Sequence, residues 1–193
     1  MSKKKYKPLF VCKMVGKKNC LKFIYATIAL ILIFILTLLG TNIISLAVTI
    51  GLLILGSLSS QFVRMFGNIN MGIEFIPFVS IIFFYAFGFP PAMLATIIMM
   101  IASLLMVGHV SIDMMFSIGI FVVIGLLTYL IDFGSIATNG IIMIGIFNIL
   151  TLILSTLVGL DMVKNIMYFF GSIFFNYILF RFFSEILFTL LLL

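Results

Sequence analysis

Charged residues are scarce in this chain. Asp, Glu, Lys and Arg make up 8% of its 193 residues, against 65% apolar residues, whereas soluble domains carry about 25% charged residues. The chain also has no tryptophan, one histidine and two cysteines. A water-soluble fold could not bury so large an apolar fraction, so the composition predicts a protein that is solvated by lipid.

The same scarcity argues against an enzyme. With one histidine there is no Ser–His–Asp spacing and no H-E-x-x-H motif, and the chain has neither a Gly-rich phosphate loop nor a C-x-x-C pair. Cys12 and Cys20 lie far apart with no histidine nearby, which does not suit a metal site. We therefore expect no catalytic residues, no metal and no cofactor.

The longest uncharged stretch separates Lys22 from Arg64. Its 41 residues contain no Lys, Arg, Asp, Glu or His. That is too long for one crossing, because about 20 helical residues span the hydrocarbon core of a bilayer. The segment Gly40-Thr41-Asn42 divides the stretch, which predicts a transmembrane hairpin.

Apolar runs of similar length fill the rest of the chain. They are apolar on every face, unlike the alternating strands of a membrane barrel, so we expect helices. The predicted fold is an all-α, polytopic transmembrane bundle of six to seven spanning helices, and residues 23–193 form one domain. The seven candidate segments are 23–39, 43–62, 73–89, 92–108, 114–131, 141–160 and 165–193.

Turn signals separate these runs. Pro77 should kink the third segment or follow a short non-helical start, and Gly88-Phe89-Pro90-Pro91 reads as a tight turn into the fourth. Residues 132–140 are rich in turn residues and predict a loop. Asp132 and Asp161 are interpreted as markers of helix ends.

Residues 1–22 form a separate basic segment. They hold eight of the 11 basic residues, which predicts a cytoplasmic N-terminus of a multi-pass protein of the cell membrane. Lysines beside a first span can also contact anionic headgroups, so the lipid bilayer is the expected partner, and nucleic acid is not. The eight lysines are Lys3, Lys4, Lys5, Lys7, Lys13, Lys17, Lys18 and Lys22.

Polar residues within the apolar runs are the candidate ligand-binding residues, because polar groups in a bilayer are expensive. Asn68, Asn70 and Glu74 cluster before the third segment, either as part of a ligand site or as a solvated interfacial loop. Asn148 and Asn176 lie within the last two segments. Asn148 could bind a ligand or act as a hydrogen-bonding contact between helices.

Two further pairs have helical spacing. Arg181 and Glu185 stand at i and i+4 and can form an ion pair, which would face the bundle interior if deep in lipid and would be ordinary near the membrane surface. Ala47 and Gly51 make a small-xxx-small pair on the second segment. Such a face permits close helix approach, either inside the bundle or against a partner protein.

Three stretches carry a family resemblance. Asn70 to Pro77 leads into one apolar helix, and Phe87-Gly88-Phe89-Pro90-Pro91-Ala92 opens the next. This resembles the substrate-binding S components of energy-coupling-factor transporters, whose last helix is similar to Phe175-Asn176 through Arg181. The bacterial rod-shape protein MreD shares a similar pattern.

The resemblance to S components implies a six-helix core that binds a small molecule and hands it over with a transmembrane coupling protein and ATPase subunits. The Ala47/Gly51 face would then be similar to the helix that S components present to the coupling protein. Seven segments are one more than the six core helices of an S component. If the N-terminus is cytoplasmic, the added first span would invert the core relative to that of an S component. Either the first segment does not cross, the N-terminus lies outside, or the resemblance misleads. The alternative is an MreD-like scaffold that organises envelope-assembly proteins.

Overall fold

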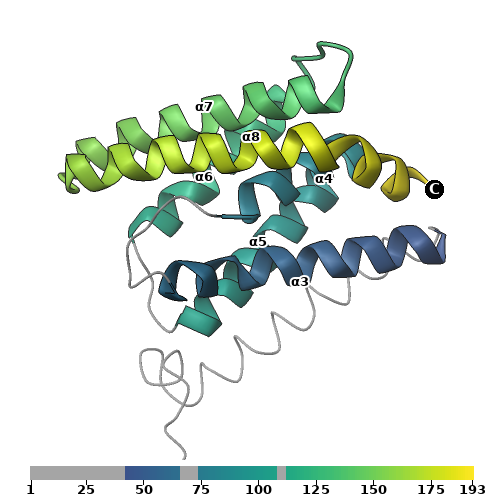
Figure 1. Ribbon diagram of the computed structural model, residues 1–193, viewed down its shortest axis with the longest axis horizontal. Helices are drawn as coiled ribbons and strands as arrows, with labels where there is room; N and C mark the ends of the chain where they lie inside the picture. Colours follow the sequence, from purple (N-terminus) through teal and green to yellow (C-terminus); the bar gives the residue numbers. More distant parts are fainter. Residues whose placement is uncertain (1–41, 66–73, 108–111) are drawn as a thin grey trace, which may run out of the picture.

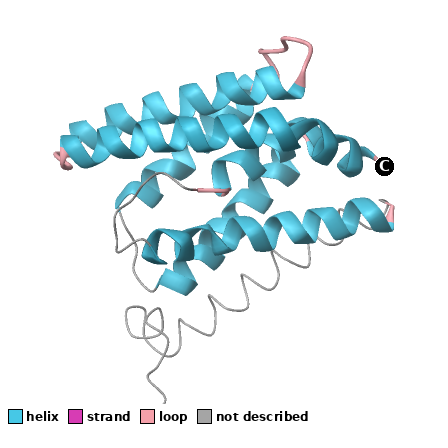
Figure 2. Ribbon diagram, in the orientation of Figure 1, coloured by secondary structure: helices cyan, strands magenta, loops and turns pink. Residues whose placement is uncertain are grey.

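The computed structural model describes residues 42–65, 74–107 and 112–193. Every regular element in these ranges is an α-helix (Figure 2), so the all-α fold class is confirmed. The basic segment 1–22 and the first apolar segment 23–39 lie outside the described residues. The helices are α3 (Ile43–Met65), α4 (Ile76–Phe87), α5 (Phe89–Val107), α6 (Ile112–Leu127), α7 (Ile136–Leu157) and α8 (Met162–Leu192).

The helices pack around α4. In Figure 1, α7 and α8 run side by side along one side of the bundle, α3 lies on the opposite side, and α4, α5 and α6 lie between them. Eight consecutive residues of α4, Pro77 through Phe84, are buried. A helix that is apolar all round needs this setting, since it has no polar face to turn toward water. Five fully buried phenylalanines fill the core, two from α4 itself and three from other helices: Phe78, Phe83, Phe121, Phe147 and Phe180.

The start and end of α4 follow the predicted signals. Pro77 lies in its first turn, where a missing N–H breaks no helical hydrogen bond. The helix ends at Phe87, and the next residue, Gly88, has a φ of 77°, a conformation that favours glycine. Phe89 begins α5 directly, with Pro90 and Pro91 in its first turn. A tight turn lies where it was predicted, but it is shorter: only Gly88 separates the two helices, and Phe89, Pro90 and Pro91 already belong to α5.

The start of α7 differs from the prediction. The loop expected at residues 132–140 ends early, because Ile136 already begins the helix. The Ser135 side chain caps it by accepting a hydrogen bond from the Thr138 N–H at 3.1 Å. Asn139 is a turn residue by composition, yet it lies in the first turns of α7 and bonds back to the preceding loop. The Ser135 cap and the contact of Asn139 with the loop therefore outweigh the preference of these residues for a turn.

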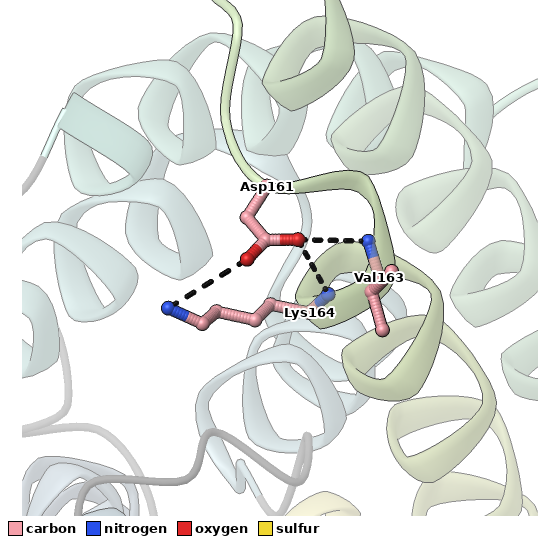
Figure 3. Close-up of polar contacts among 3 residues, drawn as sticks. All are labelled: Asp161, Val163 and Lys164. Atoms are coloured by element: carbon pink, nitrogen blue, oxygen red, sulfur yellow. Dashed lines mark hydrogen bonds and ion pairs between the residues drawn. The ribbon is translucent and has the colours of Figure 1, made fainter.

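Asp161 begins α8. Its carboxylate accepts hydrogen bonds from the N–H groups of Val163 and Lys164 and lies 3.8 Å from the Lys164 ammonium group (Figure 3). This confirms the interpretation of Asp161 as a marker of a helix end. The short connection from α7 contains Gly159 at a φ of 80° and makes α7 and α8 an antiparallel hairpin.

The described helices differ in length. By length and composition, α7 with 22 residues and α8 with 31 residues could each cross a membrane, and the other described helices offer shorter apolar stretches. The 12 residues of α4 reach about 18 Å, which is less than the hydrocarbon thickness of about 30 Å. Full crossing by the predicted segment at 73–89 would need more than α4 alone.

Candidate functional site

A row of polar and aromatic residues winds along the buried side of α8. We call it the α8 ridge; its members are Tyr168, Ser172, Asn176, Phe180 and Ser184. They are spaced four residues apart, so each is the neighbour of the next along the helix. All but Tyr168 are fully buried. The ridge carries polar groups into the interior of the bundle.

Asn176 is the most unusual member of the ridge. Its amide nitrogen donates to the Ser172 carbonyl at 2.9 Å and approaches the Ser172 hydroxyl at 3.4 Å. Its Oδ1 has no hydrogen-bond partner, although the residue is 0% exposed. Because the nitrogen must be the atom that meets the carbonyl, the unpartnered atom is the oxygen.

Asn148 repeats this arrangement on α7. Its amide nitrogen donates to the Ile144 carbonyl at 2.8 Å, and its Oδ1 has no partner at 1% exposure of the residue. Most buried polar atoms in proteins are hydrogen-bonded, so two such oxygens on neighbouring helices call for an explanation.

The contact between Gly140 and Phe180 places the two amides relative to each other. A Cβ at Gly140 would clash with the Phe180 ring, so this ring packs directly on the α7 backbone. Asn148 lies two turns beyond that contact and Asn176 one turn, both toward the α7–α8 connection. Their levels along the hairpin therefore differ by about 6 Å, or four residues of rise.

Aromatic pairs fix α4 along the ridge. Phe78 meets Phe180 edge to face with ring centroids 4.8 Å apart, and Phe75 meets Phe175 in the same way at 5.1 Å. These pairs hold α4 against α8 on either side of the level of Asn176. The Ser80 hydroxyl on α4 is also buried without a partner.

Glu74 stands at the outer end of the ridge. It comes just before α4, and its Oε2 accepts a hydrogen bond from the Tyr168 hydroxyl at 3.1 Å. Both residues are partly buried. Tyr168, Ser172 and Asn176 are successive members of the ridge, so Glu74 is bonded to the ridge residue that precedes Asn176 by two turns of α8. Asn68 and Asn70 lie outside the described residues.

The opposite end of the bundle has a polar cluster of a different kind. Asn139 is also buried, but both ends of its amide are used: Oδ1 accepts from the Phe133 N–H at 2.8 Å, and the nitrogen donates to Asp132 at 3.2 Å. The Gly134 N–H and then the Asn139 amide hold the pKa of Asp132 below its ordinary value. These complete hydrogen bonds fit a structural role in the α6–α7 loop.

Arg181 and Glu185 do not form the buried pair that was predicted. Both side chains are exposed on α8, and no ion pair joins them among the residues that the structure describes. Arg181 follows Phe180, which packs on Gly140, so the arginine lies on α8 at about the level of the first turns of α7. The expectation of a buried pair is corrected accordingly.

Ala47 and Gly51 are exposed on α3. A Cβ at Gly51 would meet nothing within 4 Å, so this face is not used for packing among the described helices. Ser45, Leu52 and Gly56 instead turn inward: Ser45 donates to the Leu191 carbonyl at 2.7 Å, and Gly56 packs on Met99.

Sequence reasoning selected Asn148, Asn176 and Glu74 but missed Tyr168 and Ser172 as their neighbours. The signal was present, since Tyr168, Ser172 and Asn176 are polar residues repeated every four positions in an apolar segment. Together the site offers amide oxygens, hydroxyl groups and a carboxylate, which suit binding through hydrogen bonds. Among the described ranges, no group of three or more His, Cys, Asp or Glu could hold a metal ion.

No protein-family model, curated protein or solved structure matches this chain.

Proposed function

We propose that this chain is a multi-pass membrane protein that binds a small solute between α4, α7 and α8, in the manner of the S components that its sequence resembles. The exposure of its apolar helices supports the membrane setting. Of the most apolar 18-residue stretch of each helix, only 33% is buried inside the protein in α7 and only 22% in α8. The core helix of a soluble protein would be mostly buried, so lipid is the natural solvent for the remainder.

The two unpartnered amide oxygens carry the proposal. Leaving a buried acceptor without a partner costs about 1–3 kcal/mol, and a bundle that served only as a support could avoid this with leucine at both positions. A bound solute that donates to Asn148 and Asn176 would supply the missing hydrogen bonds. Glu74, held by Tyr168 at the outer end of the ridge, would meet the solute first.

The release of bound solute tests this function. The protein, purified in mild detergent, should release a small molecule on denaturation, detected by mass spectrometry at up to one equivalent. Asn176→Leu should lose that molecule, because it removes an acceptor while keeping the number and branching of the side-chain atoms. Tyr177→Phe changes an exposed neighbour on α8 and should retain it. Absence of any released molecule from the parent protein would contradict solute binding.

The resemblance to S components also implies partners, namely a coupling protein and ATPase subunits. The open face at Ala47 and Gly51 supports α3 as the docking helix, because small residues let a partner helix approach closely. Gly51→Leu should therefore abolish co-purification of these partners and leave the thermal stability of the chain unchanged. Loss of stability would mean that this face packs within the protein.

A second candidate function is the MreD-like scaffold, and the outer side of α8 favours it. Phe170 and Phe174 are 66% and 68% exposed and lie in line with the exposed Tyr177, Arg181 and Glu185. Aromatic and arginine side chains are common at the centres of protein interfaces. Co-purification of envelope-assembly proteins without ATPase subunits and without a released solute would favour the scaffold.

A further inference from the structure

We propose that the outer side of α8 is a contact surface between two copies of this chain. In this contact the α8 helices of the two copies lie side by side and parallel, and Arg181 of each copy forms an ion pair with Glu185 of the other. The inference rests on the membrane setting of the proposed function, but it does not depend on solute binding.

Large exposed side chains follow one line along the outer side of α8. We call this line the α8 seam; its members are Val163, Met167, Phe170, Phe174, Tyr177 and Arg181. The first five are between 48% and 68% exposed, and Arg181 is exposed as well. The members are spaced alternately four and three residues apart, which is the spacing at which two helices pack side chains between one another. The seam therefore has the geometry of a helix–helix contact.

The middle of the seam is aromatic. Phe170 and Phe174 are 66% and 68% exposed, one turn apart. The ring of Phe170 is held edge to face against the ring of Phe169, with centroids 5.4 Å apart. A side chain that is already held in place loses less conformational freedom when a partner covers it. Aromatic and arginine side chains are also the residues that most often dominate the energy of protein interfaces.

The charges of Arg181 and Glu185 call for a partner. Both side chains are exposed, and no ion pair joins either of them to another residue within the described ranges. Exposed apolar side chains continue beyond them along α8, since Ile186 is 61% and Leu192 is 59% exposed. The two charges therefore lie within an apolar surface and not at its end. Charged residues in membrane helices usually pair or face the interior of the bundle, and these two do neither.

Arg181 and Glu185 are poorly arranged to neutralise each other on the same helix. A basic residue four positions before an acidic one is the less favourable order for pairing, because the opposite order also agrees with the helix dipole. A second molecule that brings both a carboxylate and a cation can satisfy the two charges better.

A second copy of this chain carries these groups at the required spacing. Two copies in one membrane have the same orientation, so their α8 helices run parallel when the seams face each other across a two-fold axis. Arg181 of each copy then lies about 6 Å, or four residues of rise, along the axis from Glu185 of the other. The long arginine side chain can reach over this offset, so both ion pairs form together. The docking face proposed for a coupling protein is on α3, a different helix.

Charge reversal tests this contact in the full chain. Two differently tagged copies are co-expressed and extracted in mild detergent; one tag is captured and the other is detected. We expect parent copies to capture each other, and light scattering should give the mass of two chains. Arg181→Glu in both copies, or Glu185→Arg in both copies, places like charges across the contact and should weaken self-association about tenfold or more.

Complementary variants separate a lost contact from a misfolded chain. An Arg181→Glu copy co-expressed with a Glu185→Arg copy again has opposite charges across the contact. The double variant Arg181→Glu/Glu185→Arg restores both pairs in reverse. Both combinations should recover the capture seen with the parent.

Two phenylalanines provide a matched pair for the apolar part of the seam. Phe174 and Phe182 lie on the same helix and are both 68% exposed, but only Phe174 belongs to the seam. Phe174→Ala should therefore weaken self-association, and Phe182→Ala should not. Equal effects of the two variants would contradict a contact along the seam.

The remaining outcomes separate this contact from the proposed function. A parent that stays a single chain, or charge reversals that the complementary copy does not rescue, would overturn the contact between copies. A different protein that binds the single chain and is lost in Phe174→Ala would assign the seam to that protein instead. Absence of a released solute would overturn solute binding alone. If alkaline carbonate strips the chain from membranes, the membrane setting fails, and the parallel contact fails with it.

Discussion

Replacing Asn176 with leucine should stabilise the solute-free protein. The substitution removes the unpartnered Oδ1 from the interior and keeps the number and branching of the side-chain atoms. The Ser172 carbonyl, which loses the Asn176 amide, remains within α8 and can keep its backbone hydrogen bond. The Ser172 hydroxyl, which loses its 3.4 Å contact with the same amide, can rotate to donate to the carbonyl one turn earlier in α8.

The magnitude follows from two opposing terms. Removing an unpartnered buried acceptor gains about 1–3 kcal/mol, and losing the bond from Asn176 Nδ2 to the Ser172 carbonyl costs about 0.5–1.5 kcal/mol. The net expected gain is about 1 kcal/mol. For a protein of this size that corresponds to a rise of about 2–4 °C in the thermal midpoint.

The same substitution at Asn139 is the matched control. This asparagine is also buried in α7, but both ends of its amide have partners. Asn139→Leu makes the same steric change and loses two hydrogen bonds, which should cost about 2 kcal/mol or more, because the Phe133 N–H loses its partner. The two variants should therefore move the midpoint in opposite directions.

Differential scanning fluorimetry of the solute-free protein in one detergent measures both shifts. If Asn176→Leu lowers the midpoint as far as Asn139→Leu does, the Asn176 oxygen has a partner in the folded protein. The amide would then be a structural contact between helices, and the argument for a solute site would lose its main support.

Three further predictions concern other parts of the chain. Gly140→Ala should destabilise the protein by about 1–3 kcal/mol, because a Cβ there would clash with the Phe180 ring. Gly145→Ala should not, because a Cβ at that position would meet no atom within 4 Å. The thermal midpoints of the two variants test the difference. The pKa of Asp132 is lowered on folding, so the ionised carboxylate stabilises the folded protein above the unfolded pKa of about 3.9. This contribution is lost as pH falls through the lower folded pKa. The parent should therefore lose more stability than Asp132→Asn between pH 5 and pH 3. A membrane-impermeant maleimide should label Cys12 and Cys20 only after the membrane is opened, and labelling in intact cells would place the N-terminus outside.

The helices were predictable where apolar runs end at strong local signals. Pro77 and Gly88 bound α4, and the predicted segments at 43–62 and 165–193 differ from α3 and α8 by about one turn at most. The prediction was poorest at the start of α7, where Thr138, Asn139 and Gly140 resemble a turn. Hydrogen bonds from Asn139 to the α6–α7 loop and the packing of Phe180 on Gly140 hold these residues in a helix. Neither contact can be inferred from neighbouring residues.

The candidate site was predictable only in part. Asn148 and Asn176 stood out because polar residues are rare in such apolar segments. Their missing partners could not be predicted, because that depends on which way each amide turns and on what the facing helix offers. The exposure of Arg181 and Glu185 was equally hidden, since an i, i+4 pair has the same spacing on the inside and the outside of a helix.

In the proposed membrane setting, the direct junction of α4 and α5 at Gly88 constrains how the chain can enter the bilayer. At about 18 Å, α4 cannot span the hydrocarbon core as an independent helix, and it exposes almost no surface for lipid to solvate. It must stay beside α5 during insertion and be enclosed when α7 and α8 are synthesised. Chains truncated after residue 131 should therefore be held by the insertion machinery or degraded, and those that include the whole α7–α8 hairpin should be released into the bilayer.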